Sequence, residues 1–122
     1  MIADTTFLSD FWHERLRRRA GPASAFAARH RSQRLLVTVV SAGEIAVIFD
    51  STAEAQAFLN PYRILRLTPE IAYAAAEIDR ELSQRLGEND NWIAGFCRYY
   101  GQPVISRDAA FDRVRGLRRL TY

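Results

Sequence analysis

The sequence predicts an α/β fold, a three-layer sandwich in which helices flank a mainly parallel central sheet. The main observation is that short apolar runs of strand length alternate with longer segments of helical periodicity. The second is size, because 122 residues of which 48% are hydrophobic can bury the core of one domain without disulfides or structural zinc. No repeat or low-complexity linker divides the chain. We therefore expect residues 1–122 to form a single domain.

The expected strands are short apolar or alternating runs, and the expected helices carry apolar residues every three or four positions. The strands are expected at residues 1–4, 35–40, 62–67, 103–106 and 117–121. The helices are expected at residues 7–20, 23–34, 41–48, 52–59, 68–86 and 89–100. Because the two kinds of segment alternate, most strands are expected to run parallel, with the last one at an edge of the sheet.

Particular residues mark the expected helix ends. Ser41 is a plausible N-cap for the third helix, and Thr68 followed by Pro69 is typical of a helix start. Gly87 and Gly101 follow helical stretches and are expected to end them. These ends decide which acidic residues fall in the first turn of a helix.

Arginine supplies all of the positive side-chain charge. The chain has 17 arginines, no lysine and 14 acidic residues, for a formal net charge of +3. A GC-rich genome explains this bias as well as function does, but the planar arginine fork also suits bidentate contacts with phosphate. If four acids share one pocket, the remainder carries 17 arginines against ten acids. An acidic pocket on a basic body is expected of an enzyme that acts on a polyanion.

Cysteine usage and hydropathy indicate a soluble, cytoplasmic protein without a membrane segment. The single cysteine, Cys97, cannot form an internal disulfide, which fits a reducing compartment. The longest aliphatic run, residues 35–40, is far shorter than the roughly 20 apolar residues of a membrane span. The first ten residues contain acids and no basic region, so they do not resemble a signal peptide.

Four acidic residues follow predicted strands or begin predicted helices. Asp4 ends the first strand and Asp108 follows the strand at 103–106, while Glu44 and Asp90 lie in first turns of helices. Ligands of parallel α/β sheets bind at the carboxyl ends of the strands, so all four side chains are expected to converge there. Each acid alone is more simply explained as a helix cap. The interpretation therefore depends on the four acids together.

Carboxylates gathered in one place repel one another unless a cation binds between them. Oxygen ligands select hard cations, so the expected cofactor is Mg²⁺ or Mn²⁺ rather than zinc. His13 and His30 lack partners at zinc-binding spacing and are expected at the surface. With such an ion, a carboxylate site can activate water and stabilise charge on a phosphodiester. The spacing alone predicts an acidic metal pocket in an α/β domain.

Three segments carry a family resemblance. They read IADTTFLSDFW near the start, VTVVSAGEIA in the middle, and LGENDNWIAGFCRYYGQPVISRDAAFDRVRGL in the second half. The third is the most specific, since it combines the pattern G-x-N-D-x-x-I-A with a following strand and S-R-D-x-x-F. Together they resemble the PIN-domain family, and more specifically its bacterial VapC-type toxins, over essentially the whole chain.

The resemblance assigns an acidic quartet as the catalytic and metal-binding residues, namely Asp4, Glu44, Asp90 and Asp108. Thr6 stands where the family often has asparagine or serine, and its hydroxyl could orient Asp4 or a ligand water. Asp112 could lend a supporting oxygen near Asp108, although a surface role is favoured for it.

The family implies Mg²⁺- or Mn²⁺-dependent hydrolysis of RNA, frequent homodimers and inhibition by a cognate antitoxin from a neighbouring gene. Two departures from its pattern stand out. Asn91 occupies a position that is usually apolar, and the segment between Glu44 and Tyr62 is shorter than is typical. Neither departure removes an acid, so the resemblance still implies a catalytically competent protein.

Three other functions make different demands on the sequence. A phosphoacceptor receiver domain also has an acidic Mg²⁺ pocket in an α/β fold, but it needs a lysine, and this chain has none. A PIN fold that serves only as an interaction module is expected to have lost one or more acids. A housekeeping nuclease acting on DNA or precursor RNA usually carries extra domains, for which 122 residues leave no room.

Overall fold

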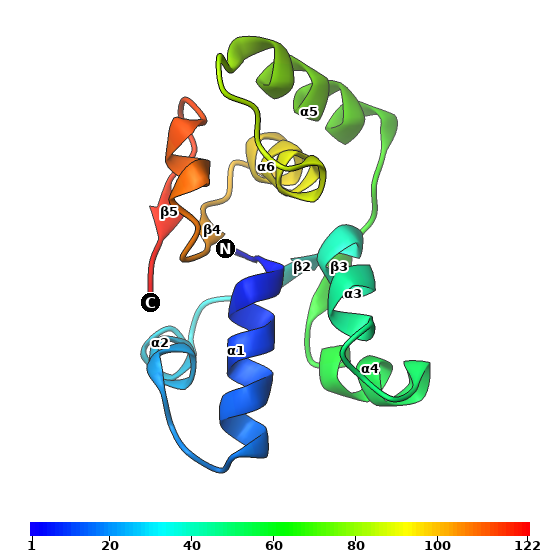
Figure 1. The fold of residues 1–122 in the computed structure, drawn as a ribbon, viewed down its shortest axis with the longest axis vertical. Helices are drawn as coiled ribbons and strands as arrows, with labels where there is room; N and C mark the ends of the chain where they lie inside the picture. Colours follow the sequence, from blue (N-terminus) through cyan, green and yellow to red (C-terminus); the bar gives the residue numbers. More distant parts are fainter.

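The computed structural model describes residues 1–122 and contains a five-stranded sheet in which every neighbouring pair is parallel, in the order β3-β2-β1-β4-β5 (Figure 1). The strands are β1 (Ile2–Ala3), β2 (Leu36–Thr38), β3 (Arg63–Leu65), β4 (Val104–Ile105) and β5 (Arg119–Leu120). The helices are α1 (Thr5–Leu16), α2 (Pro22–Arg29), α3 (Val39–Ala46), α4 (Thr52–Leu59), α5 (Pro69–Glu81), α6 (Glu88–Tyr100) and the 3-10 helix η1 (Ala109–Arg113). The predicted α/β class and parallel sheet are confirmed.

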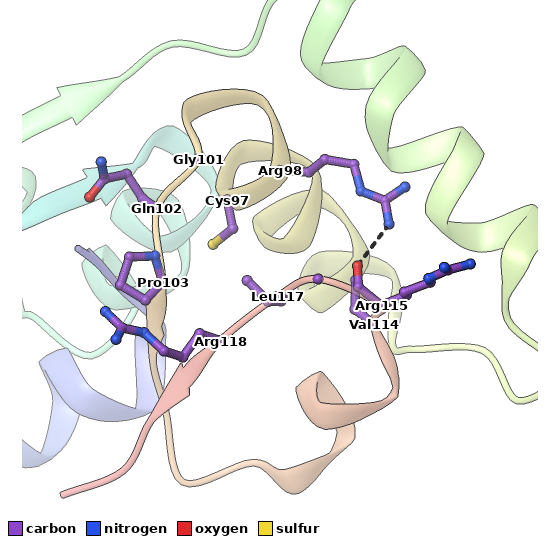
Figure 2. Close-up of a pocket in the computed structure, with 10 residues that line it drawn as sticks. Cys97, Arg98, Gly101, Gln102, Pro103, Val114, Arg115, Leu117 and Arg118 are labelled. Carbon is purple, nitrogen blue, oxygen red and sulfur yellow. Dashed lines mark hydrogen bonds between the residues drawn. The ribbon is translucent and has the colours of Figure 1, made fainter.

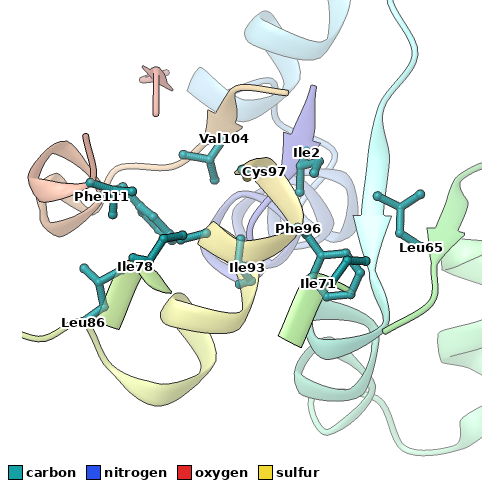
Figure 3. Packing of buried hydrophobic residues seen from close by; sticks show 12 residues of the cluster. Ile2, Leu65, Ile71, Ile78, Leu86, Ile93, Phe96, Cys97, Val104 and Phe111 are labelled. Carbon is teal, nitrogen blue, oxygen red and sulfur yellow. The ribbon is translucent and has the colours of Figure 1, made fainter. Parts of the chain in front are cut away.

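Each face of the sheet is covered by its own hydrophobic cluster, because successive side chains of a strand point to opposite faces. Ile2 and Val104 belong to the cluster under α5 and α6, which Figure 3 shows from close by. Ala3 and Ile105 belong to the other cluster, which includes side chains of α1, α2 and α4. Each large side chain buried here contributes about 1.5–3 kcal/mol to the free energy of unfolding. Helices on both faces give the expected three layers.

Helices α5 and α6 pack unusually closely. A Cβ placed on Gly95 of α6 would lie 2.8 Å from the Ala75 Cβ and 3.0 Å from the Ile71 carbonyl oxygen, so only glycine fits there. One turn earlier, Asn91 donates a hydrogen bond to the Ala75 carbonyl oxygen at 3.0 Å. The polar residue at this usually apolar position thus ties the two helices together, although its own Oδ1 atom is buried without a partner.

Several predicted helix ends were wrong. The first helix, expected to reach residue 20, ends at Leu16 before the arginine run. The helix expected to reach residue 86 ends at Glu81, where Leu82 becomes extended (φ −87°, ψ 128°). The chain must turn there before α6, and Leu86 still reaches the core from the connecting segment. The helix at 23–34 likewise ends at Arg29.

The third helix begins earlier than predicted. Its N-cap is Thr38 rather than Ser41, because the Thr38 Oγ1 atom accepts a hydrogen bond from the Ser41 N–H at 3.0 Å. The second strand consequently ends at Thr38, and the two valines that follow belong to α3. Glu44 therefore lies in the second turn of α3 and not in the first. No helix of the protein combines the length and apolar character needed to cross a membrane.

Candidate functional site

Asp4 lies at the carboxyl end of the central strand, where β1 passes directly into α1. Its side chain caps the helix, since Oδ1 accepts a hydrogen bond from the Phe7 N–H at 2.7 Å. Only 3% of the residue is exposed. A carboxylate is seldom buried to this degree without a cation as partner, and none of the ion pairs in the protein includes Asp4.

Asp108 reaches the same edge from the neighbouring strand. Because Ala3 pairs with Ile105, the residues that follow them, Asp4 and Ser106, leave the sheet side by side. Ser106 is fully buried, and its Oγ atom accepts a hydrogen bond from the Asp108 N–H at 2.9 Å. The Asp108 side chain caps η1 by accepting from the Ala110 N–H at 2.8 Å. Both strand ends thus present a carboxylate held by backbone N–H groups.

Glu44 and Asp90 reach this edge from helices. Thr5 donates a hydrogen bond from its hydroxyl to Glu44 Oε1 at 2.7 Å, which ties α3 to the first turn of α1. Asp90 is in the first turn of α6 and is half-buried. It carries no hydrogen bond or ion pair to another side chain, so it is the least restrained of the four acids.

The electrostatics show that the four acids, hereafter the carboxylate cluster, influence one another. Burial raises the pKa of Asp4 to about 6, despite hydrogen bonding to Ser106 and the Phe7 N–H, and Asp90 and Asp108 raise it further. Burial also raises the pKa of Asp90, with added repulsion from Asp108 and Glu44. Repulsion between like charges of this kind requires that the side chains lie close together.

The donor set fits a hard divalent cation, because every group offered is a carboxylate oxygen. No three acidic, histidine or cysteine side chains are arranged closely enough to hold an ion as they stand. Hydrogen bonds instead hold Glu44 against Thr5 and Asp108 against the Ala110 N–H. The cluster therefore matches Mg²⁺ or Mn²⁺ in chemistry and charge, and each of these hydrogen bonds occupies only one oxygen of its carboxylate.

The supporting residues differ from those the sequence suggested. Thr6 is exposed and makes no hydrogen bond from its side chain, whereas its neighbour Thr5 holds Glu44. Asp112 pairs with both ends of the Arg119 guanidinium at 2.9 and 2.8 Å, and Arg119 also donates to the Ser106 carbonyl oxygen at 3.2 Å. Asp112 therefore has no direct contact with the carboxylate cluster and is linked to it only through Arg119 and Ser106.

Two hydroxyl residues of the site, Thr5 and Ser106, were not predicted. The sequence offered one indication for each residue: Thr5 directly follows Asp4, and Ser106 lies two residues before Asp108. His13 is exposed as expected, and His30 is half-buried and stacks on Phe26. Neither histidine approaches the carboxylate cluster by hydrogen bond or ring contact.

Comparison with protein families matches residues 1–117 to the PIN domain. Among curated proteins, no sequence matches the chain.

Solved structures share the fold at low sequence identity. VapBC2 from Rickettsia felis bound to a promoter DNA fragment is 13% identical, with a TM-score of 0.79 and coverage of 98% of this chain and 96% of that one. VapBC-1 from nontypeable Haemophilus influenzae is 18% identical, with a TM-score of 0.75 and coverage of 98% and 96%. A toxin–antitoxin complex from Klebsiella pneumoniae is 17% identical, with a TM-score of 0.72 and coverage of 95% and 93%.

The raised pKa of Asp4 predicts how the stability of the metal-free protein depends on pH. Its folded pKa of about 6 exceeds the ordinary value of 3.8, so the folded state binds the proton more tightly. The favourable contribution is complete below pH ~4 and is lost as pH rises to about 6. Asp4→Asn keeps the helix cap and removes this loss, so it should stabilise the chelated protein at pH 7 by about 2–3 kcal/mol.

Denaturant unfolding at pH 4.5 and 7.0, in chelator, measures this effect. The control is Asp112→Asn, because Arg119 lowers the pKa of Asp112; that carboxylate stabilises the fold at neutral pH and the benefit is lost on acidification. A stability loss at pH 7 in Asp4→Asn, equal to or larger than that in the control, would contradict the assigned electrostatics.

Proposed function

Since the chain belongs to the PIN-domain family, we propose that residues 1–122 form an endoribonuclease domain that hydrolyses RNA with Mg²⁺ or Mn²⁺. The observation that carries the proposal is the carboxylate cluster. Four separate elements supply one acid each to the same sheet edge, around a carboxylate that is only 3% exposed. Burial raises the pKa of Asp4 and of Asp90, and repulsion from the neighbouring acids raises both further. A cluster that destabilises itself when charged is a site that favours a divalent cation.

The proposed roles follow from what each side chain contacts. Asp4 is the fixed ligand, because the Phe7 N–H and the surrounding core leave it little freedom. Glu44 is oriented by Thr5, and Asp108 by the Ala110 N–H. Asp90 makes no hydrogen bond or ion pair to another side chain and is suited to adjust when substrate enters. The bound ion would supply an activated water and stabilise negative charge on the phosphodiester.

Two alternatives stay distinguishable by experiment. An interaction module has no need to bring four acids to one edge of the sheet, so the carboxylate cluster favours catalysis. A nuclease specific for DNA or precursor RNA would use the same ion chemistry. The substrate assay below separates these by comparing RNA with DNA of the same sequence.

We expect the purified protein to cleave RNA with Mn²⁺ or Mg²⁺ and to stop when chelator is added. Asp90→Asn should lower the rate at least ~100-fold, since losing an outer partner of a metal ligand already costs about 10–100-fold. Glu70→Gln, an exposed acid in the first turn of α5, is the matched control and should cleave normally. Undiminished cleavage by Asp90→Asn at equal purity would refute the site assignment.

We also propose that the protein is a cytoplasmic toxin whose partner is a cognate antitoxin, and that it forms a homodimer. In support, the similar solved structure from Klebsiella pneumoniae is named a toxin–antitoxin complex. The chain also has a cavity of about 670 Å³ lined by α1, α4 and the segment after α3, including Trp12, Ile48 and Phe58. Beside it Leu16 is 58% exposed and Ile48 44%. Exposed apolar side chains around a groove suit an apolar segment of another protein.

Expression of this chain alone should arrest growth, and co-expression of the adjacent gene should relieve the arrest and yield a co-purifying complex. Ile48→Arg should prevent co-purification, whereas Tyr99→Arg, at a residue on α6 that is 51% exposed, should not. The molar mass of the complex tests the homodimer. Normal growth without the neighbour, together with no co-purification, would rule out the toxin proposal.

A further inference from the structure

Arginines gather at the amino edge of the sheet, opposite the carboxylate cluster. Four segments lead into strands there: residues 29–35, 60–63, 98–103 and 114–118. They contain no acidic residue and seven arginines, which we call the amino-edge patch: Arg29, Arg31, Arg34, Arg63, Arg98, Arg115 and Arg118. The rest of the chain then has ten arginines against 14 acids. A protein with a net charge of only +3 is thus strongly polarised.

The N-terminal ammonium group adds to the same edge. It donates hydrogen bonds to the Gln102 Oε1 atom at 2.9 Å and to the Arg34 carbonyl oxygen at 3.3 Å. Parallel pairing brings these segments together although they lie far apart in the sequence, since β1 pairs with both β2 and β4. Positive charge therefore runs along the edge from β3 to β5.

A pocket of about 430 Å³ opens in this patch between the end of α6 and the segments before β4 and β5 (Figure 2). Pro103, Val114 and Leu117 give it an apolar lining, and Arg98, Arg115 and Arg118 give it a cationic one. Figure 2 shows Arg115 beside Arg98 and Arg118 beside Pro103, on the two sides of Leu117. Apolar and cationic residues therefore both line this pocket.

Two of these arginines have no carboxylate partner. Arg98 is paired with Glu81 through two hydrogen bonds of 3.0 and 2.9 Å and also donates to the Arg115 carbonyl oxygen at 3.3 Å, so it holds the pocket together. Arg115 and Arg118 are exposed and take part in none of the four ion pairs. Gly116, at φ 80°, lets the chain turn between them. Free, exposed arginine forks are the groups best suited to phosphate.

We propose that this pocket binds phosphate groups of the RNA at a distance from the carboxylate cluster, which rests on the ribonuclease function proposed above. Helix α6 links the two places, with Asp90 in its first turn and Gly101 at its end. Eleven helical residues span about 17 Å, so a ligand that reaches both places has to be an extended polyanion.

A long, evenly charged ligand fits the arrangement better than an acidic peptide does. The arginines are spread over four segments along the whole sheet edge, and each can take a phosphate in bidentate fashion. The patch also supplies an attraction for RNA that the rest of the protein lacks, because acids predominate outside it and the carboxylate cluster itself repels a polyanion. Attraction at the amino edge would keep an RNA on the protein.

The test is binding of a single-stranded RNA of about 20 nucleotides, followed by fluorescence anisotropy in chelator so that nothing is cut. Arg115→Gln with Arg118→Gln should lower affinity roughly 25-fold at about 0.1 M salt and flatten the salt slope by about 1.4, because each lost contact removes ~0.7. Arg118→Gln alone should flatten the slope by about half as much. Arg17→Gln with Arg19→Gln removes the same charge from the exposed end of α1 and should change little.

Thermal melting of each variant confirms folding, since surface changes of this kind shift stability by less than about 0.5 kcal/mol. An unchanged slope and affinity in the pocket variants overturns this proposal, while cleavage that depends on Asp90 leaves the ribonuclease function standing. Equal losses in the Arg17 and Arg19 control overturn it as well. If the pocket variants instead lose only binding of a polyglutamate peptide, the partner is an acidic polypeptide. If the wild type binds no RNA, this proposal fails, and the cleavage assay alone decides the ribonuclease function.

Discussion

Burial of the Asp4 carboxylate at the end of the central strand is the interaction on which the rest of the site depends. A charged group removed from water costs free energy unless hydrogen bonds or an opposite charge offset that cost. The Phe7 N–H and Ser106 offset part of it, whereas Asp90 and Asp108 add repulsion, and the pKa rises to about 6. No arginine pairs with Asp4. The cost that remains is what a divalent cation would relieve.

The parallel sheet places the carboxylate cluster and the amino-edge patch at opposite edges. Because all strands run the same way, residues that follow strands meet at one edge and residues that precede them meet at the other. The carboxylate cluster lies at the first edge, where Arg66 and Arg107 also follow strands, and the amino-edge patch lies at the second. Helix α6 reinforces the pattern, with Glu88 and Asp90 in its first turn and Arg98 in its last, as the helix dipole favours.

Much of this was predictable, because strand ends and helix starts are local features of the sequence. The order of the elements and the places of the four acids along them depend on periodicity and caps, and α4 was predicted at its observed bounds. The end of α5 was not predicted, because no local residue marks it. Leu82 leaves the helix in an extended conformation and packs against the hydrophobic cluster under α5 and α6. Thr38 and Ser41 both have a hydroxyl group that could cap α3, so the sequence alone does not decide between them. In the fold the cap is Thr38, whose Oγ1 atom accepts from the Ser41 N–H.

Supporting residues and the amino-edge patch were beyond sequence reasoning for a different reason. Thr5 and Ser106 are common hydroxyl residues whose partners, Glu44 and Asp108, become neighbours only when α3 packs on α1 or the chain leaves β4. The seven arginines are scattered from residue 29 to residue 118, and only strand pairing gathers them. The composition shows that arginines outnumber acidic residues, but it does not show where on the protein they lie.

The central claim is that the carboxylate cluster, built around a buried Asp4 without a cationic partner, is a binding site for a divalent cation. Thermal melting near neutral pH, with chelator or with Mn²⁺, tests it on the wild type and on Asp90→Asn with Asp108→Asn. At ten times its dissociation constant, Mn²⁺ should add about 1.4 kcal/mol, a melting shift of about 3–10 °C, to the wild type only. The double variant should melt higher than the wild type in chelator. A wild type that Mn²⁺ leaves unshifted, with a double variant less stable than it, would show that the acids are structural caps.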